Sequence, residues 1–82
     1  MKHIFIDVRE PEEFVLSHVS GAINIPLGEL ETSEVLNKLD SDEPIVVYCR
    51  SGNRSEHAKK YLKNIGYNNV VNGINQETIE VE

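Results

Sequence analysis

Residues 45–54 read Ile-Val-Val-Tyr-Cys-Arg-Ser-Gly-Asn-Arg, an apolar run that changes abruptly into a short polar loop. The run from Ile45 to Tyr48 has the length and composition of a buried strand. Apolar residues at i, i+3, i+4 and i+7 then mark an amphipathic helix, namely Ala58, Tyr61, Leu62 and Ile65. Gly66 is placed to cap that helix. The sequence therefore predicts a strand, a loop and a helix in direct succession.

The rest of the chain alternates strand and helix signals in the same way. Expected strands are 4–8, 22–25 (stopped by Pro26) and 70–71 (ended by Asn72-Gly73). Expected helices run from Pro11 to about Ser17, and through Val35, Leu36 and Leu39 after a Thr32 or Ser33 N-cap. Residues 74–82 show no clear pattern. This alternation predicts an α/β fold with a parallel sheet, whose ligands bind beyond the carboxyl ends of the strands.

Cys49 lies at such a carboxyl end and is the only cysteine of the chain. A thiol there faces backbone N–H groups of the loop and of the helix start, and Arg50 and Arg54 flank it. Both features favour the thiolate, which is the reactive form of cysteine. The alternative is a buried structural cysteine that packs as a small hydrophobe. The electropositive surroundings favour the nucleophile.

Length and composition restrict the class of protein. We expect a single domain over residues 1–82, because a chain this short has no room for a second core. No apolar stretch approaches the roughly 20 residues that span a bilayer, and the run after Met1-Lys2 is too short for a secretory signal. We therefore expect a cytoplasmic protein with no membrane partner. A mature exported protein whose leader had been removed would have the same composition.

The net charge of −6 argues against a nucleic-acid partner, but it is distributed unevenly. Residues 49–63 hold five basic residues against one acidic residue, a net charge of +4, which leaves −10 on the remainder. A positive segment that begins at the thiol predicts a small anionic substrate or an acidic partner surface. For the three lysines a solvated helix face is an equal alternative. One cysteine and three histidines match no zinc template, so we expect no metal and no cofactor.

Three stretches of the chain, in this order, resemble the rhodanese-like sulfurtransferase family. They are Ile6-Asp7-Val8-Arg9-Glu10-Pro11-Glu12-Glu13-Phe14, His18-Val19-Ser20-Gly21-Ala22-Ile23-Asn24-Ile25-Pro26 and Tyr48-Cys49-Arg50-Ser51-Gly52-Asn53-Arg54-Ser55. The chain looks in particular like the short single-domain thiosulfate sulfurtransferases of the phage-shock type. The resemblance implies a small three-layer fold, with a central parallel sheet of four to five short strands flanked by helices. One departure is that the Gly-Gly stretch with which the family often closes is replaced by Gly73-Ile74.

By this resemblance, Cys49 carries sulfur as a persulfide from a donor such as thiosulfate to a thiophilic acceptor. The implied acceptors are cyanide, a small thiol or a thioredoxin-like protein. Loop N–H groups would stabilise the anionic persulfide, and two guanidinium groups would orient the donor. The substrate-binding residues would be Arg50, Ser51, Gly52, Asn53 and Arg54. Candidate supporting residues are Asp7, Arg9 and Ser55, although a structural role is favoured for Asp7 and Arg9.

The length of the loop distinguishes sulfur transfer from phosphate chemistry. Four residues stand between Cys49 and Arg54, whereas cysteine phosphatases and arsenate reductases use one more to encircle a tetrahedral oxyanion. A shorter ring suits a single terminal sulfur. A sulfur-carrier module that takes persulfide from a partner protein, without efficient thiosulfate turnover, uses the same cysteine and stays open. An inert interaction domain is disfavoured because the nucleophile is present.

Overall fold

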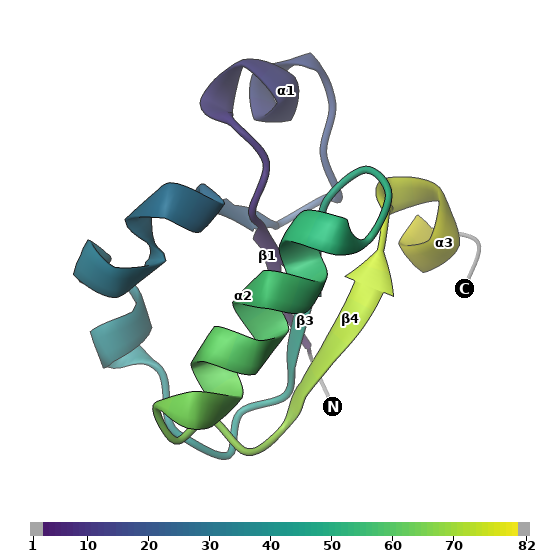
Figure 1. Cartoon of the computed structure of the whole chain (residues 1–82). Coiled ribbons are helices and arrows are strands. Elements are labelled where there is room, and N and C mark those ends of the chain that lie inside the picture. Colours follow the sequence, from purple (N-terminus) through teal and green to yellow (C-terminus); the bar gives the residue numbers. More distant parts are fainter. Residues whose placement is uncertain (1–2, 81–82) are drawn as a thin grey trace.

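The computed structural model describes residues 3–80, which fold into a four-stranded parallel sheet with helices around it (Figure 1). The strands are β1 (Ile4–Asp7), β2 (Ile23–Asn24), β3 (Ile45–Tyr48) and β4 (Val70–Ile74), in the spatial order β2-β1-β3-β4. The helices are α1 (Pro11–Leu16), α2 (Asn53–Asn64) and α3 (Gln76–Glu80), with two 3₁₀ helices, η1 (Leu27–Thr32) and η2 (Leu36–Lys38). The expected α/β fold with a parallel sheet is confirmed. Residues 81–82 of the C-terminal tail lie outside the described residues.

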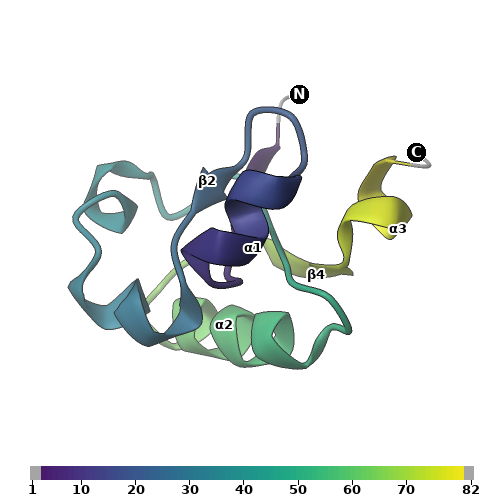
Figure 2. The same cartoon turned by 90° about the horizontal axis from the view of Figure 1, so that it is seen from above.

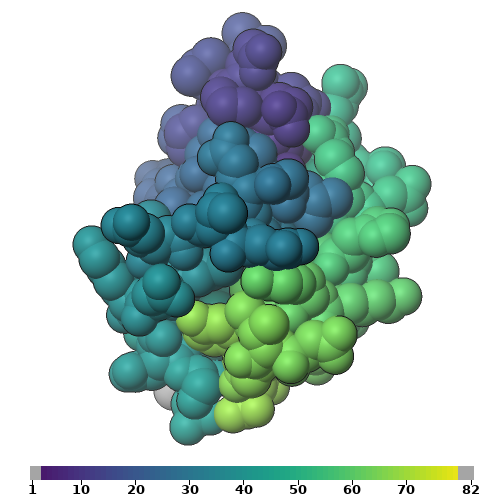
Figure 3. All heavy atoms as spheres, turned by 60° about the vertical axis from the view of Figure 1, so that its left-hand side comes forward, coloured from purple at the N-terminus to yellow at the C-terminus, as the bar shows by residue number. Residues whose placement is uncertain are grey.

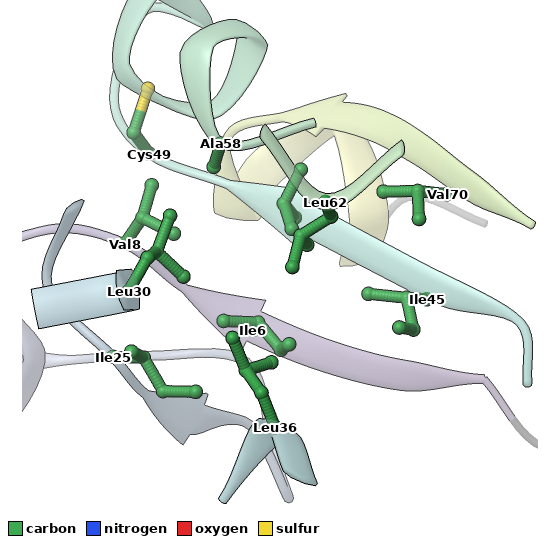
Figure 4. Packing of buried hydrophobic residues seen from close by; sticks show 11 residues of the cluster. Ile6, Val8, Ile25, Leu30, Leu36, Ile45, Cys49, Ala58, Leu62 and Val70 are labelled. Atoms are coloured by element: carbon green, nitrogen blue, oxygen red, sulfur yellow. The ribbon is translucent and has the colours of Figure 1, made fainter. Parts of the chain in front are cut away.

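Strand β3 lies at the centre of the sheet and is buried along its whole length. Its neighbour β1 is paired with it in register, so that Ile6 lies opposite Val47, and neither side chain is exposed. A strand that is covered on both faces needs apolar residues at consecutive positions, which explains the unbroken Ile-Val-Val-Tyr run. One buried cluster fills the space between sheet and helices (Figure 4): Ile6, Val8, Ile25, Leu30, Leu36, Ile45, Val47, Cys49, Ala58, Leu62 and Val70.

The helices surround the sheet on both faces and at one end. Helix α2 lies on one side of the sheet and α3 on the other (Figure 2). Helix α1 lies above the carboxyl ends of the strands (Figure 1). The residues of η1 pack against those of α2, and the space-filling view shows this contact as one continuous surface (Figure 3). The loop after β3 therefore emerges between α1 and α2.

The expected helix through Val35 to Leu39 is wrong. The segment instead forms the two short 3₁₀ helices, and neither Thr32 nor Ser33 caps an α-helix. The Thr32 hydroxyl donates to the Glu29 carbonyl oxygen, and the Ser33 N–H donates to Leu30 at the end of η1. Hydroxyl side chains that bond to nearby backbone compete with a continuing helix, and a stretch this short gains little from cooperativity.

The expected end of β4 at Asn72-Gly73 is also wrong, because the strand continues to Ile74. Gly73 is inserted as a bulge: Val47 pairs with Asn72, and Tyr48 pairs with Ile74. A Cβ on Gly73 would lie 2.7 Å from Val46 Cγ1 and 2.9 Å from Ile79 Cδ1, so any larger residue would force these side chains to shift. The Asn-Gly pair therefore serves a close approach between strands and not a turn.

Helix α2 ends as the sequence predicts, with Gly66 at a φ of 112° just after it. Of the four apolar positions predicted for its buried face, Ala58 and Leu62 are fully buried and Tyr61 packs against the core. Ile65 is 50% exposed, because it lies at the C-cap where the chain turns back toward β4. The helix holds its first turn, and with it the loop, against the sheet through the two fully buried positions.

Candidate active site

Cys49 immediately follows β3 and is almost completely buried at the top of the core. Its sulfur points away from the other labelled core side chains and toward the loop (Figure 4). The Gly52 N–H donates to Sγ at 3.1 Å, and the Ser55 hydroxyl oxygen lies 3.4 Å from Sγ. The thiol is thus part of the core by packing and part of the loop by hydrogen bonding.

The loop acquires its curvature at Gly52. This residue is the N-cap of α2 and has a φ of 95°, in the left-handed region that favours glycine. A Cβ there would also touch the Ile74 side chain at 3.4 Å. The Gly52 carbonyl accepts from the Glu56 N–H in the first turn of α2, so the residue faces the helix with one group and the sulfur with the other.

Hydrogen bonds decide the charge state of the thiol. Burial raises the pKa of Cys49, but the Ser55 hydroxyl and the N–H groups of Ser55, Gly52 and Ser51 favour the thiolate. Their combined effect lowers the pKa from 9.0 to about 7. The lower pKa raises the fraction of thiolate at neutral pH, and the thiolate is the form that attacks sulfur.

The rate of Cys49 alkylation by iodoacetamide is expected to rise as the pH increases through about 7 and to level off about one unit higher. The rate rises with pH because the thiolate is the reacting form. The rise is centred near 7 because the folded protein lowers the thiol pKa. Intact mass measured against time gives the rate, since no second cysteine reacts. The same chain unfolded in urea is the control and should titrate near the ordinary value of 9.0. A folded-state midpoint at that ordinary value would contradict the hydrogen-bonding account.

The two arginines of the loop have different environments. Arg54 forms a bidentate pair with Glu13 of α1, at 2.8 Å and 3.1 Å. Arg54 lowers the pKa of Glu13 to about 2, and the Glu10 N–H, which donates to the same carboxylate, assists. Arg50 is exposed and forms no ion pair within residues 3–80. The free guanidinium at the mouth of the loop therefore belongs to Arg50.

A hollow of about 280 Å³ opens beside the loop. Its lining combines polar and charged residues with one leucine: Arg9, Glu13, Leu16, Ser17 and Arg50. Arg9 and Glu13 are each already in an ion pair, so Arg50 is the lining residue that could attract a small anion. Two side chains of the predicted loop, Ser51 and Asn53, are exposed, and Ser51 lowers the pKa of the thiol through its backbone N–H and not through its side chain.

Asp7 and Arg9 form a buried ion pair below α1, with the closest contact, from Arg9 Nη2 to Asp7 Oδ2, at 2.6 Å. Arg9 also donates to the Ser17 carbonyl oxygen at 2.7 Å, and its guanidinium lies 5.8 Å from the centre of the Tyr48 ring. The pair ties the end of β1 to the end of α1. Its contacts are those of a support for the site, although Arg9 also reaches the hollow.

Two residues of the site were missed by the sequence reasoning. From the sequence, no role in the site is expected for Glu13, and Asn72 is placed only at the end of a strand. Asn72 contacts Ser55, Gly52 and Glu56 through its side-chain amide. The sequence indicates that an acidic residue could pair with a loop arginine, because it holds many carboxylates. Which carboxylate pairs with Arg54 depends on tertiary packing. No local sequence signal marks Asn72.

No group of three or more His, Cys, Asp or Glu side chains within residues 3–80 is arranged to hold a metal ion. Within the same residues no helix is long and apolar enough to cross a membrane.

Comparison with known proteins places the chain in a defined group. The family model described as rhodanese-like domain matches residues 1–74. The thiosulfate sulfurtransferase PspE of Escherichia coli is 43% identical over 68 residues, which cover 83% of this chain and 65% of that protein. The putative sulfur carrier protein YrkF of Bacillus subtilis is 42% identical over 67 residues, 82% of this chain and 35% of that protein. The chain thus spans less than two thirds of the length of either relative.

Solved structures agree with the fold. The structure of a rhodanese with anions from E. coli superposes with a TM-score of 0.84 at 38% identity, covering 94% of this chain and 91% of that one. The human single-domain sulfurtransferase TSTD1 gives a TM-score of 0.82 at 29% identity, covering 98% and 83%. The expected α/β fold is shared with these neighbours.

Proposed function

The chain belongs to the rhodanese-like domain family, and on that premise we propose that it is a sulfurtransferase that uses Cys49 to carry sulfur from thiosulfate or a similar donor to a thiophilic acceptor. The observation that carries the proposal is the pair of hydrogen-bonding groups at Sγ: the Gly52 N–H donates at 3.1 Å, and the Ser55 hydroxyl oxygen lies 3.4 Å away. These donors stabilise a thiolate before the reaction and an anionic persulfide after it. Neither reaction step needs a separate general base once the thiolate is formed.

The proposed reaction has two displacement steps. The Cys49 thiolate attacks the outer sulfur of thiosulfate, a new S–S bond forms, and the bond to the sulfite sulfur breaks, so that sulfite leaves with the electron pair. The acceptor then attacks the terminal sulfur of the persulfide. With cyanide as acceptor, thiocyanate is released and the thiolate is restored. Atoms and charge balance without a cofactor.

Formation of thiocyanate from thiosulfate and cyanide tests this proposal. A sulfur-carrier function is the second candidate, and it is favoured by the similarity to a protein described as a putative sulfur carrier. Steady thiocyanate production supports the enzyme. Loading of Cys49 from a protein persulfide, without turnover of free thiosulfate, supports the carrier. The proposed acceptors are cyanide, a small thiol or a thioredoxin-like protein, and the proposed compartment is the cytoplasm.

Replacing Arg50 by Ala is expected to raise the KM for thiosulfate roughly tenfold with little change in kcat, because a charge-assisted bond to the oxyanion is lost while the nucleophile remains. Arg54→Ala should raise KM less and lower the melting temperature, since Arg54 is already paired with Glu13. Lys63→Ala, which removes an exposed positive charge at the other end of α2, is the control. Unchanged kinetics in both arginine variants would show that neither guanidinium binds thiosulfate.

A further inference from the structure

We propose that Asn72 is a positioning residue of the Cys49 loop: its side-chain amide holds Gly52 and the Ser55 hydroxyl in the places from which they contact Sγ. The inference rests on the proposed function only in taking Cys49 as the reacting group. Asn72 does not itself touch the sulfur. Its effect passes through the two neighbours that do.

The Asn72 amide makes four hydrogen bonds. Nδ2 donates to the Gly52 carbonyl at 3.0 Å and to Glu56 Oε1 at 3.1 Å. Oδ1 accepts from the Ser55 hydroxyl at 2.6 Å and from the Ile74 N–H at 2.9 Å. Two donors and one carbonyl oxygen are then fully used, and the orientation of the amide is determined because each end faces partners of the opposite kind.

These bonds extend to the thiol in two ways. Gly52 is held at its carbonyl by Asn72, while its own N–H donates to Sγ. The Ser55 oxygen is held by Asn72, while it lies 3.4 Å from Sγ. The single hydroxyl proton of Ser55 has two acceptors, the amide oxygen and the ionised sulfur. Loss of Asn72 would free that proton for the sulfur, but it would also release both donors from their positions, and hydrogen bonds weaken steeply off their geometry. We expect the second effect to dominate.

The bulge in β4 supports this role. It inserts Gly73 between Asn72, which pairs with Val47, and Ile74, which pairs with Tyr48. Bulges redirect side chains beside active sites. Ile74 has a φ of 72°, which is rare for a β-branched residue, and its carbonyl accepts from the Cys49 N–H at 3.0 Å. The irregular end of β4 thus contacts the loop through both its backbone and the Asn72 amide.

Several charged groups surround the loop, and none of them comes from β4. They are Arg50 in the loop, Arg54 and Glu56 of α2, Glu13 of α1, and the Asp7–Arg9 pair at the end of β1. An Asn72→Ala substitution changes none of these charges. A shift in the thiol pKa of that variant therefore reports the uncharged donors.

Asn72→Ala is expected to raise the pKa of Cys49 by roughly one unit, measured from the pH dependence of iodoacetamide alkylation. Because the thiolate is the reacting form, alkylation at pH about 6 should slow roughly tenfold. Asn68→Ala is the matched control: Asn68 precedes β4 and donates to Asp42, which precedes β3, so this contact lies at the opposite end of these strands from the Cys49 loop. Its alkylation profile should equal that of the unmodified protein. A folded Asn72→Ala with an unchanged thiol pKa would overturn the inference.

A double-variant experiment with Ser55 distinguishes a positioning role of Asn72 from a general loss of structure. Ser55→Ala alone should also raise the thiol pKa, and the double variant should shift it by less than the sum of the two single shifts, because Asn72 acts partly through Ser55. Fully additive shifts would contradict the proposed route. If Asn72→Ala does not fold, Asn72→Ser decides, since one short hydroxyl cannot hold both partners and an unchanged pKa would again refute the role. A shifted pKa without any persulfide from thiosulfate would refute the proposed function and leave this inference standing.

Discussion

Incubation with thiosulfate is expected to add one sulfur atom, about 32 Da, to Cys49 through attack by its thiolate, and subsequent cyanide should remove it. Intact mass spectrometry detects the adduct, and the single cysteine makes the assignment unambiguous. The Cys49→Ser variant should show no adduct. It should also lower thiocyanate formation to the uncatalysed background, a loss of at least about four orders of magnitude, because the reaction proceeds through the cysteine.

The serine variant is a strict test because serine differs from cysteine mainly in the reacting atom. Cys49 is buried, so thermal unfolding of the variant must first establish that it is folded at the assay temperature. Ser51→Ala is a useful companion: it changes an exposed hydroxyl in the same loop and leaves the backbone N–H that faces the thiol. Turnover that survives in Cys49→Ser would exclude the covalent mechanism.

The part of the site that was predictable from sequence is the part that local signals encode. An apolar run, a short polar loop with glycine and a helical pattern follow one another at residues 45–66, and each signal depends only on near neighbours in the chain. The strand, the loop and the helix around Cys49 and Gly52 were therefore predictable. The parallel sheet followed from the same local signals, repeated along the chain.

The contacts that complete the site join distant segments. Arg54 pairs with Glu13 across 41 positions, and Asn72 reaches Gly52 across 20. Chain order does not encode such pairs, because several acidic residues precede the loop and the strand register decides where Asn72 lies. The Asn72-Gly73 pair even carries a turn signal, which tertiary packing against Val46 overrides. The helix predicted after Pro26 was wrong for a local reason. Its helical pattern was too short to prevail over hydrogen bonds between hydroxyl side chains and the nearby backbone.

Insertion of one glycine between Gly52 and Asn53 is expected to lower thiosulfate sulfurtransferase activity roughly a hundredfold, the cost of misplacing reacting groups by about 1 Å. The insertion separates the Gly52 N–H, which donates to Sγ, from helix α2, whose first turn is anchored at the Gly52 carbonyl. It also moves Ser55 relative to the sulfur, so the thiol pKa should rise in the same variant. A glycine inserted between Ser20 and Gly21, in an exposed turn away from the loop, is the matched control and should leave kcat/KM unchanged.

The loop length also predicts that the unmodified protein does not hydrolyse phosphate esters. Four residues between Cys49 and Arg54 leave a ring sized for one terminal sulfur, and Arg54 faces Glu13, so no complete set of donors surrounds a tetrahedral phosphoryl group. Hydrolysis of an aryl phosphate should therefore stay at the background measured with Cys49→Ser, although the thiolate is a good nucleophile. Cys49-dependent aryl phosphate turnover that equals thiosulfate turnover would overturn the functional assignment, because it would show that the ring accepts a tetrahedral group. An insertion variant with undiminished sulfur transfer would show in turn that the spacing of the N–H donors does not govern the reaction.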